Sequence, residues 1–236
     1  MGKEQKVAVI TGASQGIGAG LVKAFRDHDY RVVANSRSIK PSSDPDLLAV
    51  PGDIADPEVA RRVITQGLER FGSIDTLVNN AGIFIASPFT KYTEDQFAAM
   101  VATNLAGFFH ITQRAIAAME KQGSGHIVNI TTSLVDHASS SVPSVLASLT
   151  KGGLNSATKS LAIEYAKKGI RVNAVSPGVI KTPMHTPDTH EFLANLHPVG
   201  RMGEIPDIVG AVLYLESAGF VTGEILHVDG GQSAGH

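Results

Sequence analysis

The stretch Thr11-Gly-Ala-Ser-Gln-Gly-Ile-Gly18 decides the fold of this chain. It follows the apolar run Val7-Ala-Val-Ile10 directly and leads into a helical pattern of apolar residues at Leu21, Val22 and Phe25. A strand, a glycine-rich turn and a helix start are what a dinucleotide pyrophosphate site requires, because glycine lets the backbone approach the phosphates and the helix N-terminus faces their charge. Glycines also make ordinary turns, so the interpretation depends on the strand and helix on either side. With both present, the stretch predicts a nucleotide-cofactor site.

Length and composition indicate one soluble domain spanning residues 1–236. Of these residues, 43% are hydrophobic and 18% charged, and a chain of this size buries roughly 70–75% of its unfolded surface. With a net charge of −2, the chain has no excess of positive charge that would favour binding to nucleic acid or to a membrane surface. The absence of cysteine excludes disulfides and thiolate chemistry, and the histidines lack ligand spacing, so we predict no metal. Met1–Lys6 has no signal-peptide core and no apolar run could span a bilayer, so we expect a cytoplasmic protein.

Short apolar runs alternate with helical periodicity along the whole chain. This alternation predicts an α/β fold, a doubly wound Rossmann-like domain with a mostly parallel seven-stranded sheet flanked by helices. Two segments interrupt the rhythm: Ser36–Pro45 is predicted to be a loop, and residues 176–203, with four prolines and three histidines, are the predicted substrate loop. The expected strands are Lys6–Ile10, Arg31–Asn35, Leu48–Val50, Thr76–Asn79, Ile127–Thr131, Arg171–Val175 and Ile225–Val228, and the expected helices are 16–28, 56–71, 93–121, 144–168 and 204–217.

Motifs in this order resemble those of the short-chain dehydrogenase/reductase family over nearly the whole chain. Thr11–Gly18 resembles the family's cofactor turn, Asn79-Asn-Ala-Gly82 its central-strand motif and Val228-Asp-Gly-Gly231 its C-terminal signature. Asn104 lies where the family has an active-site asparagine, and Lys151 matches the lysine of its Tyr-x-x-x-Lys pair. The resemblance implies an oxidoreductase that transfers hydride between a nicotinamide cofactor and a small-molecule substrate. It also implies a homo-oligomer, either a tetramer or a dimer.

The same resemblance assigns the cofactor contacts. Asp53 resembles the aspartate that binds the adenine amino group, while Ser36 stands where an NAD-selective member carries an acid, followed by Arg37. Without a carboxylate at Ser36 and with the Arg37 guanidinium next to it, the site favours the 2′-phosphate of NADP(H), so we expect NADP(H) over NAD(H). One residue argues against this: Gln15 stands where many NADP-binding members have a basic residue. The short, proline-containing segment between Arg37 and Asp53 predicts that the family's helix there is lost or reduced. The expected contacts are Gly12, Ser14, Gln15, Gly16, Ile17, Gly18, Ser36, Arg37, Asp53, Ile54, Asn80, Ala81, Gly82, Lys151, Pro177, Gly178, Val179 and Thr182.

The catalytic positions depart from the family pattern. Ala147 lies four residues before Lys151, where the family has its acid/base tyrosine, and positions four apart share one helix face. The family serine falls on Thr132 by position, and Ser133 is the neighbouring alternative. We therefore expect Asn104, Thr132, Ser133 and Lys151 to be the catalytic residues. In the family the asparagine holds a water near the lysine, so Lys151 with that water is one proton source; a histidine near the substrate is another, at His137, His185, His190 or His197.

Two functions of different classes remain open at this point. The first is an NADP(H)-dependent oxidoreductase for carbonyl or otherwise activated acceptors that need little proton assistance. The second is an NADP(H)-binding sensor or scaffold whose acid/base group has been lost. Candidate substrate contacts are Met184, His185, Phe192, Leu193 and Leu196, and the apolar residues compatible with subunit contacts are Leu146, Leu149, Leu154, Leu161 and Ile163.

Overall fold

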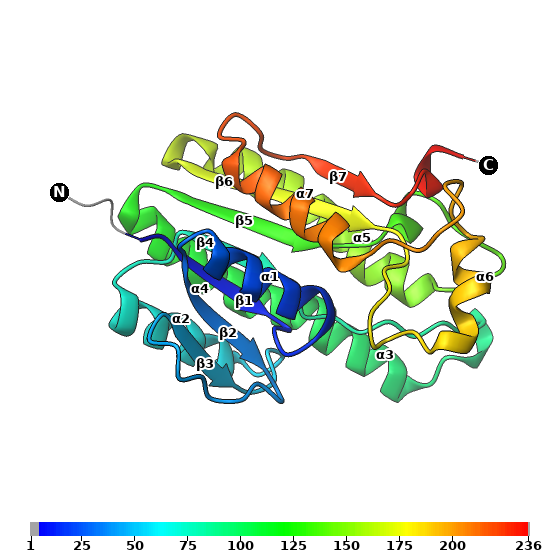
Figure 1. Cartoon of the computed structure of the whole chain (residues 1–236), viewed down its shortest axis with the longest axis horizontal. Coiled ribbons are helices and arrows are strands. Elements are labelled where there is room, and N and C mark those ends of the chain that lie inside the picture. Colours follow the sequence, from blue (N-terminus) through cyan, green and yellow to red (C-terminus); the bar gives the residue numbers. More distant parts are fainter. Residues whose placement is uncertain (1–4, 236) are drawn as a thin grey trace.

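Seven parallel strands form one sheet in the order β3-β2-β1-β4-β5-β6-β7 in the computed structural model, which describes residues 5–235 (Figure 1). The predicted fold class is confirmed. The strands are β1 Val7–Thr11, β2 Arg31–Ser36, β3 Leu47–Pro51, β4 Thr76–Asn79, β5 Gly125–Ile130, β6 Ile170–Pro177 and β7 Ile225–Val228. The helices are α1 Gly16–Asp27, α2 Pro57–Phe71, α3 Glu94–Val101, α4 Gly107–Gln122, α5 Val145–Tyr165, α6 His190–Ala194 and α7 Ile205–Ser217.

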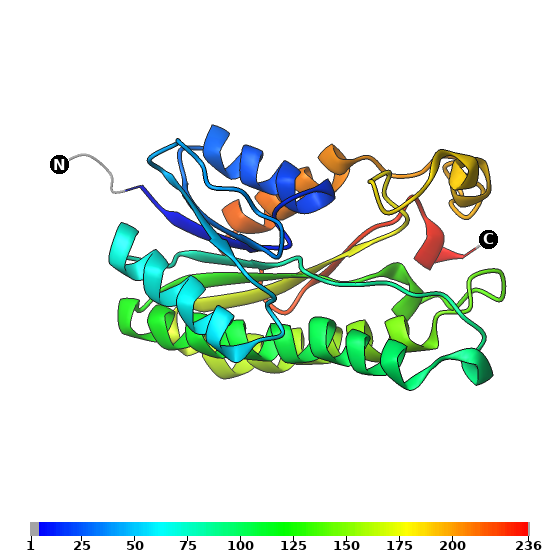
Figure 2. The same ribbon diagram turned by 90° about the horizontal axis from the view of Figure 1, so that it is seen from below.

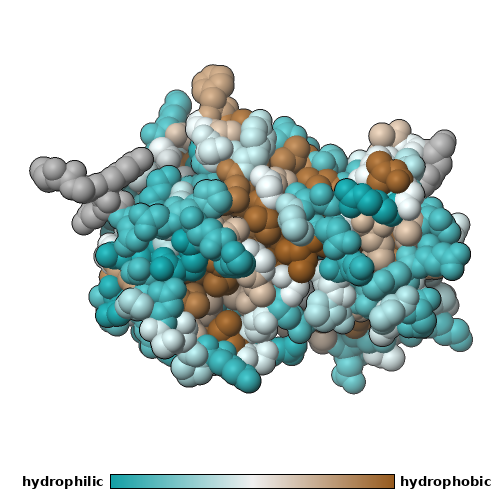
Figure 3. Space-filling model, in the orientation of Figure 1, coloured by the Kyte–Doolittle hydropathy of each residue, from teal (hydrophilic) through white to brown (hydrophobic). Residues whose placement is uncertain are grey.

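Helices cover both faces of the sheet, which explains why its strands read as continuous apolar runs. In β1, Val7 and Val9 pack in the core under α2, α4 and α5, whereas Ala8 and Ile10 pack on the opposite side under α1 and α7. Figure 2 shows these two layers edge-on. In Figure 3, apolar side chains gather in the middle of the face where α1 and α7 lie side by side. The alternation of side chains along each strand therefore distributes one apolar run between two cores.

The strand order places a switch point at the centre of the sheet. The chain runs from β1 outward to β2 and β3 and then returns to β4 on the other side of β1. In open parallel sheets, ligands bind beyond the carboxyl ends of the strands at such a point. Below it, a buried polar ladder ties β4 and β5 to the helices: the Asn79 amide donates to Thr112 Oγ1 and Asn129 Oδ1, each at 2.9 Å, and Asn129 donates to Thr158 Oγ1 at 2.8 Å.

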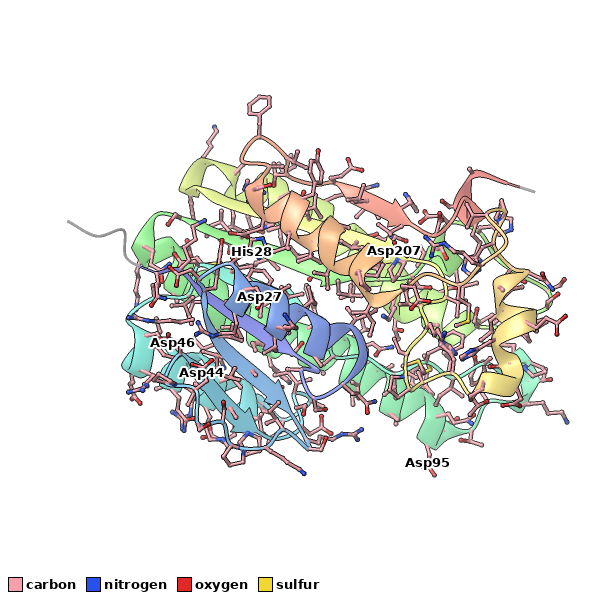
Figure 4. The ribbon with its side chains drawn as sticks, in the orientation of Figure 1. Asp27, His28, Asp44, Asp46, Asp95 and Asp207 are labelled. Carbon is pink, nitrogen blue, oxygen red and sulfur yellow. The ribbon has the colours of Figure 1, made fainter. Side chains whose placement is uncertain are left out.

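Two elements differ in detail from the sequence-based expectation. The helix expected over 93–121 is α3 and α4 joined by a π-helical turn, Ala102–Ala106. A short helix, α6, lies inside the segment 176–203, where five residues are too few to produce a recognisable period. Between β2 and β3 no helix forms, as predicted. Instead Arg26 on α1 binds Asp44 and Asp46 at 3.0 and 3.2 Å and holds the connecting loop (both carboxylates are labelled in Figure 4). Within the described residues, no helix is both long and apolar enough to cross a membrane.

A buried carboxylate organises the amino end of the sheet, opposite the switch point. Glu216 at the end of α7 accepts hydrogen bonds from His126 Nδ1 at 2.7 Å, Tyr30 Oη at 2.8 Å and Thr76 Oγ1 at 2.9 Å, and pairs with Lys6 at 3.3 Å. Burial by itself raises the pKa of Glu216, but the hydrogen bonds from His126 and Tyr30 and the charge of Lys6 outweigh it and lower this pKa to about 2. The ionised carboxylate therefore joins α7 to strands β1, β4 and β5.

Replacing Glu216 with glutamine should lower the free energy of unfolding by about 2–4 kcal/mol at neutral pH, because an amide oxygen cannot satisfy the donors that the carboxylate binds. Since the folded-state pKa lies below the unfolded one, the carboxylate contributes fully above about pH 5 and loses its contribution as the pH falls toward about 2. Urea unfolding across this range should show the wild-type and E216Q stabilities converging in acid. A difference that stays constant with pH would contradict this account; the exposed Glu69→Gln variant is the control.

Candidate functional site

A cavity of about 510 Å³ lies at the carboxyl ends of the central strands. Its walls come from the glycine turn after β1, the ends of β2, β3, β4, β5 and β6, and the segment that follows β6. Every residue expected to bind the cofactor lines this cavity except Gly18. Thr132, Ser133 and Lys151 line it as well, whereas Asn104 does not. The structure thus brings the predicted cofactor and catalytic residues to one place.

The glycine turn leaves room for a phosphate and offers it a positive helix end. Gly12 and Gly16 have φ of +65° and +56°, a conformation that other residues rarely adopt. A Cβ on Gly12 would lie 2.9 Å from Ala81 Cα, and a Cβ on Gly18 would clash with the Gly12 carbonyl. Gly18 therefore allows the start of α1 to pack closely against the turn and does not itself line the cavity. No side chain caps the start of α1 at Gln15. The residues present therefore fit a dinucleotide pyrophosphate.

Hydrogen bonds tie the ends of β1 and β4 together beneath this turn. Thr11 Oγ1 accepts the backbone N–H groups of Asn80 and Ala81 at 3.1 and 3.0 Å. The Asn80 side-chain amide donates in return to the carbonyls of Thr11 and Gly12 at 2.9 and 3.2 Å. The two motifs quoted from the sequence, 68 residues apart along the chain, form one rigid base for the cavity.

The outer end of the cavity carries an unpaired cation. Arg37 is exposed and has no hydrogen bond or ion pair with the rest of residues 5–235. Hydroxyl groups surround it: Ser38 Oγ donates to Ser14 Oγ at 3.2 Å, and Ser36 Oγ accepts the Ser38 N–H at 3.3 Å. The Asp53 carboxylate accepts the N–H of Ala55 at 3.0 Å and remains exposed on the same rim. One guanidinium and several hydroxyls are groups that bind phosphate.

Lys151 supplies the charge at the inner end. Its ammonium donates to the backbone carbonyls of Ile130 and Thr131, each at 3.1 Å. Burial lowers the pKa of Lys151 to about 8, because the charged form loses water. At neutral pH the amine is therefore mostly protonated, yet it is far more readily deprotonated than a surface lysine. A group of this kind can release or accept a proton near neutrality.

Asn104 braces the site from behind rather than lining it. It lies in the π-helical turn, is 2% exposed, and uses its whole carboxamide on protein partners. Oδ1 accepts the Ile83 N–H at 2.9 Å, and Nδ2 donates to the Ile83 carbonyl at 3.0 Å and to Thr150 Oγ1 at 3.1 Å. The Asn104 side chain therefore fixes the loop after β4 against α5, the helix that carries Lys151. Its expected role in holding a water stays a prediction.

Two adjacent hydroxyl groups differ in availability. Ser133 is 1% exposed and its Oγ donates to Gln232 Oε1 at 2.7 Å, so this proton is already used. Thr132 Oγ1 accepts the Leu134 N–H at 3.4 Å and keeps its own proton for another acceptor. Thr132 is the hydroxyl better placed to donate to a bound ligand. Gln232, which also lines the cavity, was not predicted, although it directly follows the C-terminal signature.

The side chain at position 147 is closed off from the cavity. Ala147 has no exposed surface and packs with Met100, Leu146 and, more loosely, Phe84 and Tyr92. It does not line the cavity, although Lys151, one turn later on α5, does. The space beside Ala147 is therefore filled by apolar neighbours.

The rest of the cavity is mostly apolar. Six aliphatic or aromatic side chains surround its inner half, from the loop after β4, the loop before α5 and the segment after β6: Ile83, Phe84, Val142, Met184, Leu193 and Leu196. Met184, His185, Leu193 and Leu196 were candidate substrate contacts; Phe192 is half exposed and lies outside.

Burial, with the nearby His190, lowers the pKa of His185, which favours its neutral form. Of the four candidate histidines, His185 alone lines the cavity. Nowhere in residues 5–235 do three His, Asp or Glu side chains gather as metal ligands would.

Known proteins resemble this chain over nearly its full length. A family model described as enoyl-(acyl carrier protein) reductase matches residues 12–233. The 3-oxoacyl-[acyl-carrier-protein] reductase FabG of Staphylococcus aureus (strain Mu50 / ATCC 700699) is 33% identical over 244 aligned residues, which cover 97% of this chain and 98% of that protein.

Solved structures agree with the sequence matches. ElxO with NADP bound has a TM-score of 0.90 at 30% identity and covers 98% of this chain and 100% of its own. The 3-ketoacyl-(acyl-carrier-protein) reductase from Brucella melitensis, complexed with NADH, has a TM-score of 0.89 at 32% identity, over 98% of this chain and 99% of its own. With the family model spanning most of the sequence and relatives above 30% identity spanning nearly all of it, the chain belongs to the short-chain dehydrogenase/reductase family.

Proposed function

We propose that this protein is an NADP(H)-dependent oxidoreductase that acts on the carbonyl group, or a similarly activated acceptor, of an apolar small molecule. The observation that carries the proposal is the single cavity that joins the glycine turn and Arg37 at one end to Lys151 and Thr132 at the other. Two similar structures carry NADP and NADH, and the relatives named above are reductases, which supports the reaction class.

The cofactor assignment follows from the groups along the cavity. The open start of α1 and the glycine turn would hold the pyrophosphate, Asp53 and Ile54 the adenine, and Pro177 to Val179 with Thr182 the nicotinamide end. Ser36 and the unpaired Arg37 would take the 2′-phosphate, which favours NADP(H) over NAD(H). A bound nicotinamide supplies or accepts the hydride.

Proton transfer falls to the residues of the inner half. The Thr132 hydroxyl is placed to donate a hydrogen bond to the substrate oxygen, and protonated Lys151, directly or through a water, transfers to this oxygen the one proton that it takes up on reduction; the neutral amine is then reprotonated from solvent. Ala147 contributes no proton, because alanine has no titratable group. Losing one general acid typically costs 10²–10⁴-fold in rate, so the substrates best suited to this site are those that need little protonation, such as diketones, quinones and activated double bonds.

The cavity also limits the substrate. Its inner half is lined by Phe84, Val142, Met184 and other apolar side chains, and Lys151 and His185 are the titratable groups of the described chain that line this half. A carboxylate or phosphate next to the reacting carbon would face apolar side chains at a large desolvation cost. Residues 176–203 act as the substrate loop within the single domain 1–236.

A second function is an NADP(H)-binding sensor or scaffold without turnover. The observation that favours it is Ala147 itself, which is buried among apolar neighbours and carries no acid group at that helix position. Binding of NADPH without consumption across ketones, diketones, quinones and enones would select this function over the first.

Assembly and location are also proposals. Five large apolar side chains on α3, α4 and α5 are exposed, namely Phe97, Phe109, Val145, Leu149 and Ile163. Burying them against copies of the chain would form a homo-oligomer, a dimer or tetramer. We propose a cytoplasmic enzyme with a small-molecule substrate and no nucleic-acid partner.

Arg37→Ala should weaken NADPH binding by roughly 10- to 100-fold and leave NADH binding nearly unchanged, because the lost charge-assisted hydrogen bonds reach only the 2′-phosphate. Fluorescence titration with each cofactor measures this without requiring turnover. Lys40→Ala, on the same exposed loop, is the matched control. Equal losses for both cofactors would overturn the NADP(H) assignment.

Reduction should lose activity as the pH rises through about 8, because the protonated amine of Lys151 is the form that stabilises the developing alkoxide. Lys151→Arg should move this alkaline limb upward, since guanidinium stays charged, and Lys151→Met should remove the limb together with most of the activity. Initial rates between about pH 6 and 10 test this, with Lys159→Met on the exposed face of α5 as the control. An unmoved limb in the arginine variant would assign it to another group.

Ala147→Tyr should increase the kcat/KM for simple ketones by about 10²–10⁴-fold if the phenol reaches the reacting oxygen, whereas Ala147→Phe, of matching bulk, should not. Both variants overpack the cluster around Met100, and about 1–3 kcal/mol of stability is expected to be lost in each, which thermal unfolding would report. Simple ketones reduced by the wild-type chain as fast as by A147Y would show that position 147 does not limit proton delivery.

A further inference from the structure

His197 is a buried histidine whose ring is hydrogen-bonded to the backbone on both sides. It is 4% exposed. Nδ1 lies 3.0 Å from the Leu193 carbonyl, and Nε2 lies 2.9 Å from the backbone N of Val179. A carbonyl can only accept and a backbone N–H can only donate. The ring is therefore neutral, with its proton on Nδ1, and this tautomer follows from the geometry alone.

Glycines make the close approach of this ring possible. A Cβ on Gly178 would lie 2.6 Å from His197 Nε2, and one on Gly230 would lie 3.2 Å from His197 Cβ. The neighbouring Val199 N–H donates to the Gly230 carbonyl at 3.2 Å. The ring thus sits between the turn after β6 and the turn after β7, where side chains on either glycine would displace it.

The turn that His197 contacts is a wall between two cavities. Gly178, Val179 and Ile180 line both the cofactor cavity and a second cavity of about 320 Å³, and His197 lines the second. Leu193, at the other end of the hydrogen-bonded pair, lines the cofactor cavity. His197 therefore links, from behind, two segments that face the proposed cofactor and substrate.

The loop that contains His197 is attached to the rest of the chain at its base and through Val199, whose N–H donates to the Gly230 carbonyl. Gly203 exchanges backbone hydrogen bonds with Lys181 and Val179 at 2.8 and 2.9 Å, so residues 181–202 leave and return at one point. In the described chain, the hydrogen bonds of α6 stay within this segment. His197 extends them to the turn after β6 through Val179.

We propose that His197 is a positioning residue that holds α6 at a set distance from the Pro177–Ile180 turn, and so sets the width of the substrate half of the cavity. Its neutral Nδ1–H tautomer is required, because a proton on Nε2 would break the bond to Val179. The kinetic part of this inference rests on the proposed oxidoreductase function, whereas the structural part does not.

Three variants separate the two hydrogen bonds. His197→Gln places a carbonyl oxygen near the position of Nε2 and keeps an acceptor for Val179; His197→Asn keeps a donor near Nδ1 for Leu193 and loses that acceptor. His197→Leu loses both and fills the space. Glu191→Gln, an exposed change on α6, is the control. The first readout is hydrogen exchange of peptides covering 177–202, measured by mass spectrometry on the full chain with and without NADPH, alongside the thermal unfolding midpoint.

We expect H197N and H197L to speed exchange in these peptides by roughly tenfold or more, as loss of a buried hydrogen bond allows, with H197Q close to wild type and peptides of β1 to β5 unchanged.

In turnover assays the same two variants should raise KM more than they lower kcat. If these peptides exchange in H197L at the wild-type rate, the proposal is wrong. If exchange is faster by the same factor across the whole chain, His197 contributes to overall stability and does not position α6, which also overturns the proposal. If no variant, wild type included, turns over any substrate, the proposed function fails while the exchange data still decide the role of His197.

Discussion

The site depends on the hydrogen bonds between Thr11 and the backbone of Asn80 and Ala81 at the ends of β1 and β4. A single hydroxyl there accepts hydrogen bonds from two N–H groups, of which that of Asn80 also donates to the Val78 carbonyl, and the Asn80 amide donates to two carbonyls of the glycine turn. Each such bond is worth only about 0.5–1.5 kcal/mol net, but an unpaired buried group costs more. These hydrogen bonds therefore fix the ends of β1 and β4 relative to each other. The end of β1 carries the cofactor turn, and the end of β4 carries the loop that Asn104 binds, so both walls of the cavity depend on them.

Under the proposed function, catalysis is divided among groups that lie at different depths in the site. Thr132, Ser133 and Lys151 line the cavity, Asn104 lies behind them, and Gln232 reaches in from the C-terminal segment. Lys151 is bound by two carbonyl groups rather than by a carboxylate, so its charge stays available to a ligand instead of being neutralised by a partner. The apolar cluster around Ala147, one turn before Lys151 on α5, adjoins the cavity through Ile83 and Phe84.

The features that sequence reasoning identified are those encoded locally. The glycine turn, the absence of a helix between β2 and β3 and the parallel seven-stranded sheet follow from short stretches and their spacing, and the structure agrees with each. Contacts between distant segments were beyond such reasoning. Nothing adjacent to Ser133 in the chain indicates that its hydroxyl donates a hydrogen bond to Gln232, 99 residues later. The roles of Gln232 and His197, and the burial of Ala147, depend on how loops meet after folding.

The loop between β2 and β3 shows how separable the two ends of the cavity are. It has no helix, contributes no side chain to the inner half, and is fastened to the body by Arg26 through Asp44 and Asp46. Of residues 37–43, Ser38 donates to Ser14 of the glycine turn and Ile39 packs against the core under α1 and α7, whereas the Arg37 side chain has no partner in residues 5–235. Under the proposed function, the side chain that selects the cofactor is therefore one that no other described residue holds in place, so Arg37 can be exchanged without disturbing the hydrogen bonds of Lys151.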